Sequence, residues 1–77
     1  MWIRYEYELI NLSLVKIIQR GRSSREVNLD NFCISFPGPN GAKYFLDGLE
    51  KILKNNPSNN SVFCVKDIIV AGGGDAE

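Results

Sequence analysis

Three arginines within six positions are the residues of this sequence best suited to a chemical role. Arg20, Arg22 and Arg25 surround a Gly-Ser turn in the stretch "RGRSSR", and Lys16 stands on the apolar run before it. Guanidinium groups bind phosphate oxygens through paired N–H donors, and the serine hydroxyls would add further donors. The alternative is a solvated hairpin tip, and short basic motifs often arise without any ligand. We favour the solvated tip.

Catalysis and metal binding find little support among the remaining side chains. The sequence has no histidine, the residue that most often exchanges protons near neutral pH. Cys33 and Cys64 stand far apart without a CxxC pair, so they do not supply a soft-metal site, and no usual base stands ready to activate them. Asp30, Asp47 and Asp67 have no obvious partner carboxylate. The sequence therefore predicts a protein that is not an enzyme and holds no metal or cofactor.

Composition narrows the choice of partners. Nine basic and nine acidic side chains cancel, and 44% of the 77 residues are apolar. A neutral chain has no overall field that favours a polyanion, so contact with nucleic acid would have to rest on residues 20–25. No apolar run approaches the roughly 18–20 residues of a membrane span, and the opening "MWIRYEYE" is too charged for a signal peptide. We expect a cytoplasmic domain without a membrane partner, and the sequence specifies no small-molecule ligand.

Alternation near the start of the chain predicts strands. Apolar or aromatic side chains stand at every second position, at Ile3, Tyr5, Tyr7 and Leu9. Because charged side chains stand between them, the segment predicts one half-buried strand. Asn11 and Ser13 then predict a bend, since their short polar side chains bond nearby backbone.

Two further strands are expected before the first proline. A β-branched run predicts one strand over residues 15–19, and another falls within residues 27–36. In the later half of that segment three side chains would face one way, Phe32, Ile34 and Phe36, while Cys33 and Ser35 face the other.

One amphipathic helix is predicted from Gly41 to about Lys54, with Asn40 as its N-cap. Its apolar residues fall on a single stripe, Ala42, Phe45, Leu46, Leu49, Ile52 and Leu53. Gly48 is costly inside a helix, and close approach of another backbone is one explanation for a glycine there. Pro57 disfavours the α region at Asn56 and ends the helix.

The last apolar run, residues 62–71, is predicted to be a strand that is apolar on both faces. The one helix could cover only one of these faces, so the other needs a partner, and a second copy of the chain is the simplest one. Tyr44, beside the helix stripe, could anchor such a partner. The predicted self-association residues are Val62, Cys64, Ile68, Val70 and Tyr44.

Together these elements predict one α+β domain over residues 1–71 and a flexible tail over residues 72–77. The domain would be an antiparallel β-meander of three to four strands, with one amphipathic helix packed on one side and a final strand after the helix. Residues 2–55 resemble small uncharacterised bacterial domains of PH-like build, at Trp2, Ile3, Leu9, Ile10, Asn11, Leu12, Val15 and Ile18. The resemblance implies a strongly bent antiparallel sheet with a helix against one side, and no shared catalytic residue.

Two functions stay open. The first is a non-enzymatic interaction module that assembles with copies of itself through the final strand or an exposed sheet edge. The alternative is a module that contacts nucleic acid or phosphate through the arginine-rich hairpin loop 20–25. A small-molecule pocket between helix and sheet is a third interpretation, for which the sequence offers no set of polar residues to orient a ligand.

Overall fold

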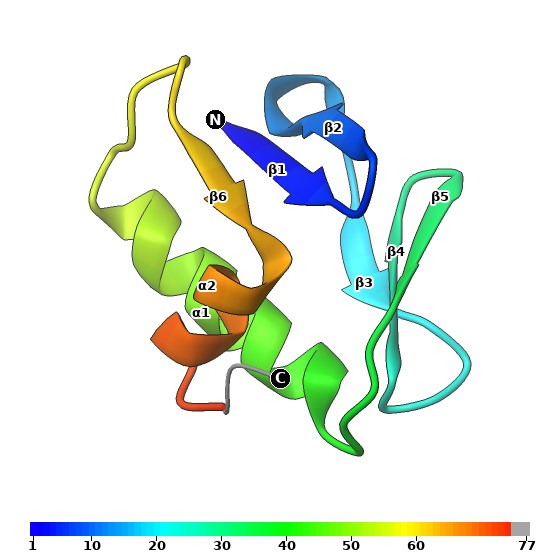
Figure 1. Ribbon diagram of the computed structural model, residues 1–77. Coiled ribbons are helices and arrows are strands. Elements are labelled where there is room, and N and C mark those ends of the chain that lie inside the picture. Colours follow the sequence, from blue (N-terminus) through cyan, green and yellow to red (C-terminus); the bar gives the residue numbers. More distant parts are fainter. Residues whose placement is uncertain (75–77) are drawn as a thin grey trace.

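The computed structural model describes residues 1–74, which form two sheets and two α-helices around an apolar core (Figure 1). The strands are β1 (Trp2–Tyr5), β2 (Glu8–Asn11), β3 (Ile18–Arg20), β4 (Glu26–Leu29), β5 (Phe32–Ser35) and β6 (Val62–Cys64). The helices are the 3-10 helix η1 (Leu12–Leu14), α1 (Gly41–Lys54) and α2 (Val65–Ala71). The predicted α+β class is confirmed. The predicted meander with one helix matches only the sheet β3-β4-β5 and α1.

The sheet β2-β1-β6 begins with a hairpin where the alternation predicted a single strand. The chain reverses through Glu6, whose φ is 55°, and Tyr7, which is 99% exposed at the tip. Leu9 then pairs with Arg4, on the face opposite Ile3, so its predicted place on the buried face is wrong. The third strand, β6, is the first part of the predicted final strand, and it runs parallel to β1.

The sheet β3-β4-β5 is antiparallel throughout, and its strands differ in extent from the predicted ones. The side-chain oxygen of Asn11 accepts a hydrogen bond from the N–H of Ser13 at 3.0 Å, which confirms the predicted bend. The bend continues into η1, so the following strand begins only at Ile18. The segment 27–36 is divided by a turn at Asp30, whose φ is 56°, and gives parts of two strands in place of one. Its predicted inward and outward faces are confirmed, since Ile34 is buried and Cys33 is exposed.

Helix α1 has the predicted bounds, but it is not capped as expected. The side chain of Asn40 makes no capping hydrogen bond. Instead, the N–H of Ala42 donates to the backbone carbonyl of Ser24 at 2.9 Å, and this carbonyl satisfies one of the free N–H groups of the first turn. The helix ends at Lys54, and Asn56 takes a left-handed φ of 51°, outside the right-handed α region that the following proline disfavours.

The predicted final strand ends at Cys64, and the rest of that segment is helix α2. The spacing of the apolar residues accounts for this helix, because Val65, Ile68 and Ile69 follow the i, i+3, i+4 pattern of a helical stripe. Ile68 is 0% exposed and Ile69 is buried with it in the core. Ile68 and Ile69 are therefore covered by this chain's own residues, while Val62 and Val70 stay exposed. The second apolar strand face predicted for residues 62–71 does not exist.

Helices α1 and α2 approach backbone to backbone at two glycines. A Cβ at Gly48 would overlap the carbonyl oxygen of Ile68, and a Cβ at Gly72 would overlap the carbonyl oxygen of Tyr44. Only glycine leaves room for this contact. The close backbone approach that could explain Gly48 is therefore present.

The segment after α2 also lies against the helices as far as the structure describes it. Gly72 contacts α1, and the N–H of Gly74 donates to the carbonyl oxygen of Ile69 at 3.0 Å. Of the tail predicted over residues 72–77, residues 75–77 lie outside the described residues. Neither α1 nor α2 combines the length and the apolar character that crossing a bilayer requires.

The core draws on both sheets and both helices, so the sheets share one interior (Figure 1). Its largest fully buried side chains are Ile3, Val27, Leu29, Ile34, Phe45 and Ile68. The ring centroids of Phe36 and Phe45 lie 5.4 Å apart, and the two rings fill the space beside the start of α1.

Candidate functional site

The arginine loop, residues 20–25, rests on the start of α1. Ser24 makes two hydrogen bonds to this region. Its backbone carbonyl accepts from the N–H of Ala42, and its hydroxyl donates to the carbonyl oxygen of Pro39. The carbonyl of Arg25 accepts from the N–H of Phe36 at 2.8 Å, so the loop is also held by the end of β5. The backbone is thus held at several points. Three exposed guanidinium groups extend from it, those of Arg20, Arg22 and Arg25.

Lys16 does not join the arginine loop. The backbone N–H of Lys16 donates to the carboxylate of Asp30, at the β4–β5 turn, over 3.1 Å. Arg20 and Arg25 flank the opposite end of the β3–β4 pair. The structure therefore brings together three of the four basic residues singled out in the sequence.

The five predicted self-association residues do not form one surface. Val62 and Cys64 are exposed on β6, and Val70 is exposed on α2. Ile68 is fully buried and cannot contact a partner. Tyr44 is half-buried, with its backbone against α2 and its ring beside Gly74.

The sheet β2-β1-β6 carries an unpartnered face that includes two of these five residues. Its strand registers set two rows of neighbours side by side, Leu9–Arg4–Cys64 and Asn11–Trp2–Val62. Side chains alternate along a strand, and the intervening row Ile10–Ile3–Phe63 points into the core, so these six point away from it. We call them the outer face. Leu9 is 58% and Val62 53% exposed there, next to the half-buried ring of Trp2.

Charge is unevenly distributed over this part of the molecule. Arg4 is the one charged residue among the six positions of the outer face, and it occupies the central strand. Its Nε donates to the carbonyl oxygen of Glu6 over 3.3 Å, which ties the guanidinium to the hairpin turn. Glu6 and Glu8, both exposed, stand at that same end of the hairpin.

Sequence reasoning missed Trp2 and Leu9 as members of this face. Trp2 has the same parity as Arg4, so the alternation along β1 could have placed it outward. Leu9 could not be placed, because the reversal at Glu6 uses neither glycine nor asparagine and leaves no usual turn signal.

Two polar side chains hold strands in place by binding backbone: Tyr5 joins the two sheets, and Asp30 ties the start of β3 to the β4–β5 turn. The hydroxyl of Tyr5 accepts from the N–H of Ser35 at 3.3 Å and donates to the carbonyl of the same residue at 3.4 Å. The carboxylate of Asp30 accepts from the N–H groups of Ile17 at 3.0 Å and of Lys16 at 3.1 Å. These bonds, that of Ile17 first, hold the pKa of the Asp30 carboxyl below its ordinary value. Both groups hold the fold together through these bonds.

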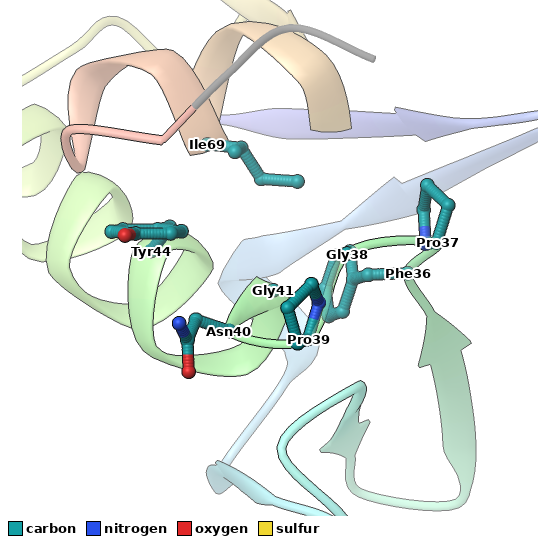
Figure 2. Close-up of a pocket in the computed structure, with 8 residues that line it drawn as sticks. All are labelled: Phe36, Pro37, Gly38, Pro39, Asn40, Gly41, Tyr44 and Ile69. Atoms are coloured by element: carbon teal, nitrogen blue, oxygen red, sulfur yellow. The ribbon is translucent and has the colours of Figure 1, made fainter.

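Two hollows border the connection from β5 to α1. Figure 2 shows the first, of about 270 Å³, where Tyr44 and Ile69 lie across from the Pro-Gly-rich segment 36–41. The second, of about 480 Å³, lies at the ends of β1, β5 and β6, and we call it the end cleft. The end cleft has charged residues on its rim, whereas the first is lined by uncharged side chains. Across residues 1–74, no three thiol or carboxylate side chains gather in a way that would hold a metal ion.

Comparison of the sequence with protein-family models, with curated proteins and with solved structures finds no match. The resemblance to PH-like domains stays a prediction.

Proposed function

We propose that the protein is a non-enzymatic interaction module that associates with a second copy of itself through the outer face. One observation carries the proposal: Leu9 and Val62 are more than half exposed beside Trp2 on a single sheet face. Apolar patches of this kind on a small domain mark interaction surfaces. A small domain buries only about 60% of its unfolded surface, so covering such a face adds noticeably to its stability.

The charge pattern favours a second copy as the occupant of this face. In a twofold assembly the same residues meet in both directions, so a cation on one copy needs a carboxylate at the related place on the other. Arg4 supplies the cation, and Glu6, in the hairpin turn at one end of the face, supplies a carboxylate. Sheets with aligned strands stack readily face to face, about 10 Å apart. Stacking two outer faces in this way lets the charges pair at their ends.

The size of the face sets the expected strength of association. Three strands of three or four residues offer less than the roughly 800 Å² per partner of a standard interface. The dimer is accordingly weak and forms only at high concentration.

Sedimentation equilibrium from about 10 μM to about 1 mM tests the proposal, a range matched to affinities of −4 to −7 kcal/mol. The wild type is expected to pass from monomer to dimer. Leu9→Glu and Val62→Glu place a charge on the outer face and should stay monomeric, while Val70→Glu, a matched exposed position on α2, should associate like the wild type. A wild type that remains monomeric throughout contradicts the proposal. Association that Val62→Glu leaves unchanged contradicts it too.

Phosphate contact by the arginine loop is a second candidate function. It is favoured by the hydrogen bonds of Ser24 and Arg25, which hold the loop backbone and so reduce the entropy that binding would cost. Fluorescence anisotropy with a single-stranded oligonucleotide should then show binding that weakens with salt. The slope should fall by about one for each of Arg20, Arg22 and Arg25 changed to Gln. No binding at low salt contradicts this candidate.

A further inference from the structure

The end cleft is formed where three strands stop together. β1 and β6 run parallel, so their C-terminal ends reach the same edge of the sheet. The hydroxyl of Tyr5 binds the backbone of Ser35 and brings the end of β5 beside them. The cleft of about 480 Å³ between these ends lies within the range of about 300–1,000 Å³ typical of small-molecule sites. We propose that it binds a small organic carboxylate with an apolar body.

The lining of the cleft suits the apolar body of such a ligand. Phe36 and Ile69 line it and are themselves buried, and Val65 and Tyr5 add apolar surface around them. These side chains belong to the core or pack against it, so the floor is formed before any ligand arrives. A preformed apolar floor with a few polar groups at its rim is the usual build of a ligand pocket.

The rim of the cleft suits the carboxylate. Arg4 at the end of β1 and Lys66 in the first turn of α2 approach from different elements, and Glu6 is the one carboxylate that lines the cleft. Two positive charges and one negative charge leave a net charge of +1 at this rim, which matches a monoanion better than a phosphate dianion. The bond from Arg4 Nε to the Glu6 carbonyl orients the guanidinium, whose terminal N–H groups form the fork that carboxylates accept.

Titration of the ¹⁵N-labelled protein with phenylacetate tests the proposal, and phenylacetamide is the neutral control. Phenylacetate should cause saturable shifts in the amide signals that line the cleft, including those of Tyr5, Phe36 and Lys66. Phenylacetamide should bind roughly tenfold more weakly, because it lacks the charge that strengthens the hydrogen bonds. Shifts that fail to saturate by about 20 mM, an affinity weaker than about −2.5 kcal/mol, contradict the proposal. Equal binding of the two probes contradicts it as well.

Substitutions of the two cationic residues on the rim of the end cleft test where the carboxylate of the ligand binds. Arg4→Gln and Lys66→Gln should each weaken phenylacetate binding roughly tenfold. Lys51→Gln, which removes an exposed cation on α1 away from the cleft, should leave binding unchanged. Lys66 lies off the outer face, so Lys66→Gln should also leave the sedimentation behaviour of the protein unchanged, which separates ligand binding from self-association. A loss with Lys51→Gln as large as that with Lys66→Gln overturns the proposed site.

Discussion

The α1–α2 contact and the outer face show two fates of apolar sequence in one small chain. At the α1–α2 contact, Gly48 and Gly72 let two backbones touch, and Ile68 is fully buried. On the outer face, Leu9 and Val62 remain more than half exposed. The apolar character of residues 65–71 is therefore used inside the fold, and the surface available for a partner lies on β1, β2 and β6. Residues 65–71 therefore offer no face for self-association, and the outer face is the surface proposed for it.

The largest expected change in the free energy of unfolding comes from adding one methyl group at the α1–α2 contact. Gly48→Ala places a Cβ against the carbonyl oxygen of Ile68 and only 2.8 Å from the N atom of Gly72, so the helices must separate. We expect the free energy of unfolding to fall by about 3 kcal/mol or more. Urea unfolding followed by circular dichroism measures this change.

Gly38→Ala is the matched control, because a Cβ there meets no atom within 4 Å. Its stability should equal or slightly exceed that of the wild type, since alanine restricts the unfolded chain. A Gly48→Ala protein as stable as the Gly38→Ala protein would show that α1 and α2 do not pack in this way.

A smaller change in stability is expected when an aliphatic side chain is shortened, and it should differ between the α1–α2 contact and the outer face. Ile68→Val removes one buried methylene and should lower the free energy of unfolding by about 1 kcal/mol. Val62→Ala, at an exposed position of the outer face, should change that of the monomer by less than about 0.5 kcal/mol. Both values follow from urea titrations at low protein concentration. Equal losses would contradict the burial that distinguishes the two sites.

The smallest effect on stability concerns the hydrogen bonds of Asp30 to the backbone before β3, and it depends on pH. Because its pKa is lowered in the folded state, the carboxylate adds stability that is fully present above its unfolded pKa, near 4. This part is lost as the pH falls through the folded pKa. Asp30→Asn keeps a residue that tolerates positive φ and should remove this part of the pH dependence. Asp47→Asn, on the exposed side of α1, is the control that should retain it.

Urea midpoints measured between pH 2 and pH 7 show the difference, since about one pH unit on either side of a pKa spans most of a titration. If the Asp30→Asn and Asp47→Asn proteins follow the same curve, the bonds to Ile17 and Lys16 do not stabilise the fold.

The sequence predicted those parts of the fold that a single local pattern of residues determines. Helix α1 was found with its bounds, because six apolar residues share one stripe and a Pro-Gly-rich segment precedes it. The bend at Asn11 was found for a similar reason, as a short polar side chain binds backbone two residues later. The cost of Gly48 in a helix suggested close approach of another backbone as one explanation, and the structure shows that approach.

The remaining elements depend on tertiary contacts that a local pattern does not report. Residues 65–71 carry two local signals, because their β-branched side chains favour a strand while Val65, Ile68 and Ile69 have helical spacing. The close contact of Gly72 with Tyr44 belongs to the helical form. The outer face depends on the reversal at Glu6 and on the parallel pairing of β6 with β1, which joins residues about sixty positions apart. The end cleft needs the bond from Tyr5 to Ser35, which links the two sheets. None of these contacts leaves a periodic signal.

Chemical cross-linking through the protein's own thiols tests the central proposal most directly. Cys64 lies on the outer face, whereas Cys33 is exposed on the sheet β3-β4-β5 and serves as the internal control. With a short bismaleimide at high protein concentration, the Cys33→Ser protein should form covalent dimers and the Cys64→Ser protein should not. Dimers that form equally well through Cys33, or no dimers with either protein, would contradict association through the outer face.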